Sequence, residues 1–405
     1  MKNIYIYLKI LLIPFAFILQ NYSIINAQIC SKTNPINCLQ FKPLARLWNV
    51  SNEEVPKLLD LEKSLISIDS KLQPLLNELD FGGTYIDMKA GKINVNTVNQ
   101  SKVNEIRNKM KNDQDFLNFI AANNTLSQLN STFNQTFILA QQFNITNYEI
   151  SIEPEFNNIV IYLNMNDGKN KRFIENVETF NPSPIIKLLP NEEKEEILFN
   201  SSILVEKRNL NILVNGGSRI VSLGHNGIKA CTAGFWMKKN NEDFIVTARH
   251  CLEIFPPLFY VYSFQDDHLI GPMNSRLIGS YDMGFIKKTN TNIMLRPVIR
   301  RFLQFLIVGS SEITSCGIHI CKAGQRTGIS CGFVSAINSI YNFVDGVLIR
   351  AIVVANMHGN YGDSSGSMFL YNGLNGQSNL ADAVGIFNRW RIRHTGNRYA
   401  NKHSF

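Results

Sequence analysis

The chain has 405 residues, of which 45% are apolar, and its formal net charge at pH 7 is +8. This length favours two domains. Residues 28–208 carry a net charge of −3 and residues 209–405 a net charge of +9. The basic side chains of the second half are scattered, without interleaved aromatic residues or a recognition helix, which argues against nucleic acid as a partner. The charge division instead favours electrostatic attraction between the two halves.

The first 27 residues have the pattern of a secretory signal peptide. Lys2 and Lys9 lie among apolar residues, and the small residue Ala27 offers a cleavage position. The alternative is a retained membrane anchor, but the apolar stretch that follows Lys9 ends at Leu19. That stretch is too short to span a bilayer core of about 30 Å. We therefore expect a secreted, extracellular protein that has no membrane attachment after signal removal.

The seven cysteines fit secretion, because an oxidising compartment permits disulfides. Cys30 and Cys38 are close enough in sequence to form a local pair. No group of Cys and His residues has zinc-site spacing, so we expect no metal, and no motif predicts a cofactor. Sequons for N-glycosylation predict a glycoprotein, and none follows residue 208. Their acceptors include Asn49, Asn99, Asn123, Asn130, Asn134, Asn144 and Asn200.

The first half has both helix and strand patterns. Apolar residues recur at helical spacing between residues 41 and 80, with Ser51 and the acidic residues after it as a helix start. Residues 81–87 and 92–98 predict two strands around the turn at Gly91, and apolar residues alternate between Tyr148 and Leu163. These patterns indicate an α+β unit.

Residues 180–204 have the composition of a linker, because prolines and an acidic run replace the apolar periodicity. The linker ends at Glu206-Lys207-Arg208. The dibasic pair is either a processing site for a secretory endoprotease or an ordinary charged surface pair. Beyond it, short apolar and β-branched runs are separated by turn residues, with no long helical pattern. The second half is therefore predicted to be an all-β barrel structure.

Three motifs of the second half carry side chains that can do chemistry. The run Phe-Ile-Val-Thr-Ala-Arg-His-Cys at 244–251 sets His250 at a strand end beside a half-cystine. Asp282 lies in Tyr-Asp-Met-Gly-Phe-Ile at 281–286. Ser364 lies in the small-residue turn Asn-Tyr-Gly-Asp-Ser-Ser-Gly-Ser at 360–367. Glycine in such a turn lets backbone N–H groups point at one spot, as an oxyanion site requires.

In this order the three motifs resemble those of the chymotrypsin-like serine proteases. The sequence is most similar to the secreted branch that includes α-lytic protease and the streptogrisins, which carry an N-terminal prosegment. Cys-Thr-Ala-Gly-Phe at 231–235 and the Cys-to-Cys loop at 321–331 also resemble that branch. The resemblance extends from about residue 211 to residue 390. It implies a signal peptide at 1–27, an α+β prosegment with its linker at 28–208, and a protease domain of two six-stranded antiparallel barrels at 209–405.

The resemblance also implies the catalytic roles. Ser364 would be the nucleophile, His250 the general base, and Asp282 the residue that orients the imidazole. The backbone N–H groups of Gly362 and Ser364 would form the oxyanion hole. Two alternatives remain open: the aspartate could be Asp266 or Asp267, and the nucleophile could be Ser365. The family pattern favours Ser364, because it places the nucleophile directly after the aspartate.

Supporting contacts follow from the same resemblance. Disulfides would join Cys231 to Cys251 and Cys321 to Cys331. Cys316 would then be either a free thiol or a rearranged partner of Cys321. Asp363 would pair with Lys322, which stands where the family has an arginine, so activity would not depend on a new N-terminal ammonium.

Several positions depart from the family pattern. The substrate-binding residues would include Asn388 and Trp390, and both differ from the residues that the family has there. The departures put efficiency and specificity in question more than the fold, and they fall at Arg249, Ser365, Asn388, Arg389 and Trp390.

The function that the sequence favours is a secreted serine endopeptidase, made as a precursor. Its partners would be a protein or peptide substrate and its own prosegment, acting as intramolecular chaperone and inhibitor, and it would be a monomer. The alternative is a catalytically impaired, protease-like binding protein. A nucleic-acid or glycan binder is a third class, for which no motif is present.

Overall fold

The computed structural model describes residues 35–164, 168, 170–189, 211–224, 227–262, 268–276, 281–300, 303–342, 348–373 and 377–388. Several features expected from the sequence lie outside these residues: the signal peptide, Cys30, Asn200, Asp266, Asp267, the Lys207-Arg208 pair, Arg389 and Trp390. Cys38 is disulfide-bonded. Within the described ranges, no helix has the length and apolar character needed to cross a membrane.

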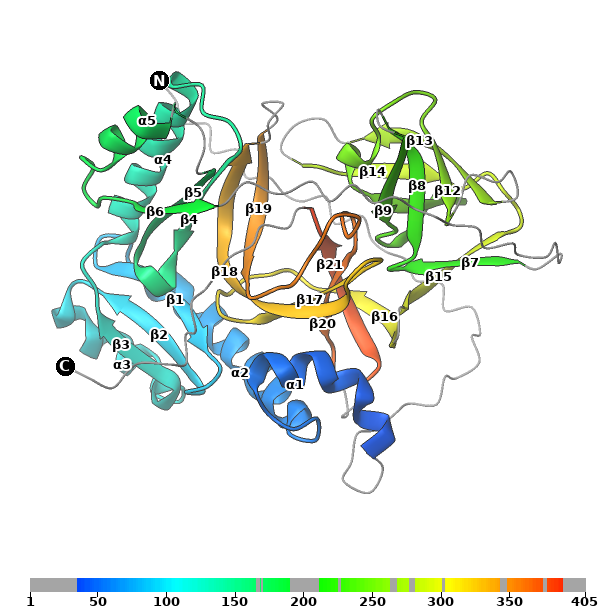
Figure 1. Ribbon diagram of the computed structural model, residues 1–405. Helices are drawn as coiled ribbons and strands as arrows, with labels where there is room; N and C mark the ends of the chain where they lie inside the picture. The colour runs from blue at the N-terminus through cyan, green and yellow to red at the C-terminus, as the bar shows by residue number, and fades with distance from the viewer. Residues whose placement is uncertain are drawn as a thin grey trace.

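The first half combines helices with two small groups of strands, as the α+β prediction requires (Figure 1). The predicted hairpin is formed by β1 and β2, and β3 adds to β2 in parallel. The elements are α1 (Lys42–Trp48), α2 (Val55–Leu72), β1 (Phe81–Asp87), β2 (Lys92–Thr97), α3 (Val103–Lys109), β3 (Leu117–Ala121), α4 (Leu126–Gln142), β4 (Tyr148–Glu153), β5 (Asn158–Asn164), α5 (Asn170–Val177) and β6 (Ile185–Leu189).

The helix predicted between residues 41 and 80 is interrupted once. Asn49 has a φ of 56°, a left-handed conformation that ends α1. The second helix, α2, begins at Val55 with a proline in its first turn. Ser51 lies just before it and donates its backbone N–H to the Glu54 carboxylate over 2.9 Å. The predicted helical region is confirmed as far as Leu75, but its second helix starts four residues after Ser51, and residues 76–80 are not helical.

The second half is built of strands, which confirms the all-β prediction. Its first sheet follows the order β10-β11-β14-β13-β12-β8-β9 and encloses a core that includes Ile220, Phe259 and Ile286. Seven strands are present instead of six, because Ala233–Phe235 separates β9 from β10. They are β8 (Arg219–Gly224), β9 (Gly227–Thr232), β10 (Trp236–Lys239), β11 (Glu242–Thr247), β12 (Leu258–Val261), β13 (Leu269–Arg276) and β14 (Gly284–Lys287).

The second barrel uses six strands, β16 to β21, and β15 and β7 extend its sheet beyond β16. Most pairings are antiparallel, but β16–β21 and β15–β7 are parallel. The antiparallel expectation is therefore wrong within this barrel at β16–β21, where the last described strand lies beside the first strand of the barrel, whereas the parallel β15–β7 pair lies outside its six strands. The bounds are β7 (Ile212–Gly216), β15 (Ile293–Arg300), β16 (Gln304–Ser310), β17 (His319–Gly324), β18 (Gly328–Asn342), β19 (Leu348–Ala355), β20 (Ser367–Tyr371) and β21 (Leu380–Ile386).

The first half docks on the second barrel through a shared sheet and a shared core. Strand β4 pairs with β18, with Ser151 opposite Ser339, so β4, β5 and β6 continue the sheet of the second barrel (Figure 1). Beneath them, Leu65 of α2 packs in one apolar cluster with Ile318 and Ile320. Burial of this apolar surface favours docking in proportion to its area.

Two buried acidic side chains of α2 also reach the second barrel. The Glu62 carboxylate accepts hydrogen bonds from His319 Nδ1 over 2.5 Å and from the His319 backbone over 2.8 Å. Asp69 accepts one from Ser315 Oγ over 2.6 Å. Burial raises the pKa of Asp69, and its hydrogen bonds oppose that rise. Buried polar groups are costly unless they are paired, so these contacts specify one docking geometry.

Candidate active site

His250 and Asp282 lie side by side at one end of the first barrel. Strand β11 ends at Thr247, which pairs with Gly284 of β14, so the residues after β11 and before β14 emerge at the same edge. There His250 Nδ1 lies 2.5 Å from Asp282 Oδ2, and the His250 backbone N–H donates to Oδ1 over 3.0 Å. Because a carboxylate oxygen accepts at Nδ1, the neutral ring would carry its hydrogen on that nitrogen. The unprotonated nitrogen is then Nε2, which can accept a proton.

The Asp282 carboxylate is buried and remains ionised. Burial raises its pKa, but hydrogen bonds and charge from His250 and the charge of Arg249 outweigh that effect, so the pKa lies below its usual value. The Arg249 side chain places Nε 3.8 Å from Oδ1. Arg249 departs from the family pattern. In the structure its side chain is a cationic neighbour of the Asp282 carboxylate.

Ser364 lies in a loop that is tied to both barrels. The Thr232 hydroxyl donates to the Gly362 carbonyl over 2.7 Å, and the Thr232 N–H donates to the Ser364 carbonyl over 2.8 Å. Gly362 has a φ of 91°, which favours glycine. Among the described residues, nothing accepts a hydrogen bond from the N–H of Gly362 or of Ser364.

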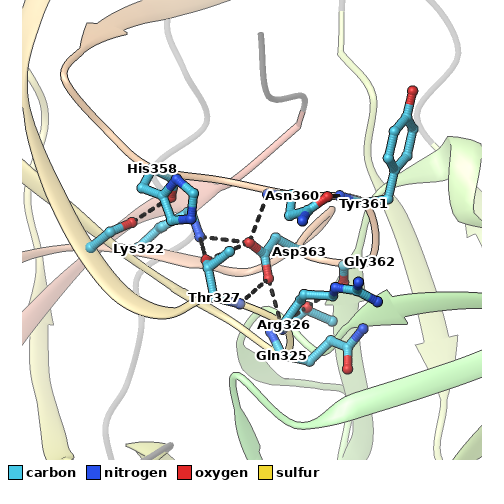
Figure 2. A network of polar contacts seen from close by, with 11 residues as sticks. Lys322, Gln325, Arg326, Thr327, His358, Asn360, Tyr361, Gly362 and Asp363 are labelled. Atoms are coloured by element: carbon cyan, nitrogen blue, oxygen red, sulfur yellow. Dashed lines mark hydrogen bonds and ion pairs between the residues drawn. The ribbon is translucent and has the colours of Figure 1, made fainter. Parts of the chain in front are cut away.

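Asp363 anchors the loop from below, as Figure 2 shows. Its carboxylate lies 2.9 Å from Lys322 Nζ, and both side chains are fully buried. Further hydrogen bonds come from the backbone N–H groups of Asn360, Arg326 and Thr327 and from the Thr327 hydroxyl. Burial raises the pKa of Asp363. The Lys322 charge and the Thr327 hydrogen bonds lower it by more than burial raises it, so the pKa lies below its usual value. The carboxylate is thus held ionised inside the protein.

Ser365, the alternative nucleophile, points away from the surface. It is fully buried, and its hydroxyl contacts Thr247, Ala248 and Cys251. Ser364 is only partly buried. In the described part of the chain, the Ser364 hydroxyl forms no hydrogen bond with His250. Catalytic hydrogen bonds are often long in unliganded structures and shorten when substrate binds.

The remaining predicted residues are placed as follows. Disulfides join Cys231 to Cys251 and Cys321 to Cys331, and Cys316 is a buried free cysteine. Burial raises the pKa of the Cys316 thiol to about 12. The Asn388 side-chain oxygen is buried and has no hydrogen-bond partner among the described residues. The predicted position of Trp390 lies outside them.

Two contacting residues were not foreseen from the sequence. Thr232 holds the Ser364 loop, and Thr327 bridges Lys322 and Asp363, with hydroxyl distances of 2.6 and 2.5 Å. Both stand in stretches that resemble the family, at 231–235 and 321–331, but nothing in a single sequence says what either hydroxyl contacts. Only the pairing of distant segments reveals what each hydroxyl contacts.

Known proteins similar to this chain are serine proteases, although no family model matches it. Serine protease 2 of Streptomyces fradiae is 24% identical over 157 residues, which is 38% of this chain and 87% of that protein. Streptogrisin-A of Streptomyces griseus is 25% identical over 163 residues, 39% of this chain and 48% of that protein. Streptogrisin-C of the same organism is 24% identical over 143 residues, 35% of this chain and 30% of that protein.

Solved structures of the same kind are also similar. Thermobifida fusca Protease A matches with a TM-score of 0.34 and 21% identity, over 43% of this chain and 82% of that one. The α-lytic protease homolog N4 matches with a TM-score of 0.34 and 20% identity, over 43% of this chain and 83% of that one.

The two barrels and the order of the motifs define a chymotrypsin-like fold. The more particular resemblance, to serine proteases of the streptogrisin type, is confirmed by the relatives. The chain spans less than half the length of the streptogrisins that it matches.

Proposed function

We propose that this chain is a secreted serine endopeptidase, made as a precursor, that hydrolyses peptide bonds through an acyl-enzyme. The observation that carries the proposal is the 2.5 Å contact between His250 and Asp282 at the edge of the first barrel. The loop that bears Ser364 meets the same edge, because Thr232 donates to its carbonyl over 2.8 Å. A base, an orienting carboxylate and a hydroxyl on a turn are the set that acyl transfer requires.

Each residue has a defined step in the proposed reaction. The Ser364 oxygen attacks the substrate carbonyl carbon while His250 Nε2 takes the hydroxyl proton. Collapse of the tetrahedral intermediate expels the amine, which receives that proton from the imidazolium, and leaves an ester on Ser364. Water then attacks this ester while His250 takes its proton, and the reaction releases the acid and restores the Ser364 hydroxyl. Asp282 stabilises the imidazolium at each stage, because its carboxylate is buried and ionised.

Charge on the intermediate would be stabilised by the backbone N–H groups of Gly362 and Ser364. Neither is used by another described residue, and one donor of this kind contributes about 2.7–4 kcal/mol to transition-state stabilisation. Asp363 and Lys322 hold the loop that presents these donors. Asn388 and Trp390 are proposed to border the substrate beside them.

The first half is proposed to be a prosegment that assists folding and blocks activity until it is released. The pairing of β4 with β18 and the buried contacts of Glu62 with His319 support this role, because they stabilise strands of the second barrel from outside. Two-barrel folds depend on non-local contacts and fold slowly, so a template that orders one barrel would accelerate folding. Cleavage after Arg208 would separate the halves.

An activity-based probe tests the proposal. The chain is expressed from residue 28, its processing is followed by mass, and it is treated with a fluorophosphonate. We expect one covalent adduct on Ser364, none in Ser364→Ala, and an unchanged adduct in Ser330→Ala, which removes a half-buried hydroxyl of the same barrel. A folded protein with no adduct would refute the peptidase and favour the protease-like binding protein.

A further inference from the structure

Ser365 has a backbone conformation that a serine rarely adopts. Its φ is 72°, in the left-handed region that favours glycine, and its side chain is fully buried. The residue before it is the proposed nucleophile, Ser364. A non-glycine residue persists in such a conformation when its surroundings hold it there. The contacts of the Ser365 hydroxyl identify what holds it.

The hydrogen-bonding capacity of that hydroxyl is fully used. Its oxygen accepts the N–H of Ala248 over 2.6 Å and the hydroxyl of Thr247 over 2.9 Å. It also lies 3.2 Å from Cys251 Sγ. Because Cys251 is in a disulfide and carries no hydrogen, the hydroxyl hydrogen of Ser365 must be the donor in that contact. A hydroxyl offers one donor and two acceptor sites, so none remains.

These contacts join the two loops that carry the proposed chemistry. Thr247, Ala248 and Cys251 lie on either side of His250 in the first barrel. The Ser365 backbone N–H donates to the Phe387 carbonyl over 2.6 Å, which fixes the same residue to the second barrel. One side chain therefore spans the junction directly beside the nucleophile. Removing it would leave the loop of His250 without this hydrogen-bonded contact to the loop of Ser364.

We infer that Ser365 is a positioning residue, which fixes the loop of His250 against Ser364 for proton transfer. The inference rests on the proposed function and adds a residue to it. It also assigns the second serine of the motif a role other than nucleophile: its proton is directed at a disulfide sulfur, which is not a base. A misplacement of about 1 Å in an active site can reduce the rate on the order of 100-fold, so one lost contact is measurable.

Two substitutions separate the hydroxyl from the backbone conformation. Both substitutions remove the acceptor of the buried Ala248 N–H and Thr247 hydroxyl, so both should lower the melting temperature. Ser365→Gly also relieves the positive φ, which Ser365→Ala retains, so its melting temperature should be the higher of the two. We expect the second-order rate of fluorophosphonate labelling to fall about tenfold in both, which is about 1.4 kcal/mol of barrier. A purely structural residue would lose rate and stability together.

Amide exchange supplies a readout that does not depend on activity. The Ala248 N–H donates to Ser365, so its hydrogen exchange, followed by NMR, should be at least tenfold faster in Ser365→Gly than in the unsubstituted protein. The matched control is Ser339→Ala, which loses a buried hydroxyl bonded to Ala351 over 2.9 Å far along β18. That variant should keep both the labelling rate and the Ala248 exchange rate.

The outcomes are distinct for the two proposals. If the unsubstituted protein is labelled at Ser364 and Ser365→Gly is labelled equally fast, the positioning role is overturned and the peptidase stands. Unchanged exchange at Ala248 overturns it as well. If the unsubstituted protein is folded but not labelled, the peptidase fails and the positioning role fails with it. Labelling that slows to the same extent in both variants despite their different melting temperatures, with faster Ala248 exchange in Ser365→Gly, supports both.

Discussion

Replacing Lys322 with methionine tests how the Ser364 loop is held. The Lys322 ammonium lies 2.9 Å from the Asp363 carboxylate in a site that is closed to solvent (Figure 2). Methionine has nearly the same length and fills the space, so the change removes the charge with little change in volume. The carboxylate keeps the hydrogen bonds from Asn360, Arg326 and Thr327. The variant therefore measures how much the Lys322 charge contributes to stability.

The expected loss of stability is about 3 kcal/mol at pH 7. Breaking a buried ion pair costs about 3–5 kcal/mol, because one charge is left without its partner. We take the lower end, since four of the five hydrogen-bond donors to Asp363 remain. Arg326→Met is the matched control. It removes an exposed cation near the same carboxylate, and it should change stability by less than about 0.5 kcal/mol.

The stability loss in Lys322→Met should depend on pH, because it comes from the ionised Asp363 carboxylate. The pKa of Asp363 is lowered in the folded protein, so its contribution to stability is present above its unfolded pKa of about 3.9 and is lost as pH falls through the folded value. Loss of Lys322 raises the folded pKa and reduces that contribution. The difference between Lys322→Met and the parent should therefore be large at pH 7 and should diminish as the pH falls through the lowered folded pKa of Asp363.

Urea unfolding in a Ser364→Ala background measures the loss without self-digestion, and fluorophosphonate labelling of the active protein measures the site. If the loop moves enough to misplace one oxyanion donor, labelling should slow by about 10²–10³. Equal stability and equal labelling in Lys322→Met would refute the reasoning. A stability loss that did not diminish in acid would show that the carboxylate charge is not its cause.

Two smaller changes test other contacts. Arg249→Ala removes a partly exposed cation 3.8 Å from Asp282, so urea unfolding at pH 7 should show a loss below about 1 kcal/mol, and the loss should vanish in acid where Asp282 is protonated. Gly317→Ala would bring a methyl group within 2.0 Å of the Ile86 carbonyl oxygen, between the two halves, and unfolding should show at least about 1–3 kcal/mol of destabilisation. Gly227→Ala is its control, because φ there is also positive but nothing lies within 4 Å, so an equal loss in both would exclude the clash.

Local sequence patterns were sufficient for much of the secondary structure. The strands on either side of Gly91 and the helical region containing α2 follow from periodicity and turn residues. The parallel additions of β3 to β2 and of β6 to β5 could not be foreseen. A parallel partner arrives through a connection of many residues, and nothing in either strand specifies it.

The residues of the candidate site could also be predicted only in part from the sequence. His250, Asp282 and Ser364 stand in motifs, so a single sequence can nominate them. The contacts of Arg249 and Ser365 could not be read from it, because each depends on the direction of a side chain between segments that only the fold brings together. Both positions depart from the family pattern. What their side chains contact required coordinates.

The arrangement of the cores suggests which barrel depends on the first half. The apolar clusters that include Leu59 and Leu65 of α2 extend into the second barrel, whereas the described core of the first barrel contains no residue from before residue 211. The second barrel carries the Lys322–Asp363 pair and hence the loop of Ser364. The first half therefore packs on the barrel that carries the Ser364 loop, and the loop of His250 is joined to that barrel through contacts across the junction, such as that of Ser365. If the halves separate after processing, those contacts alone must keep the two loops together.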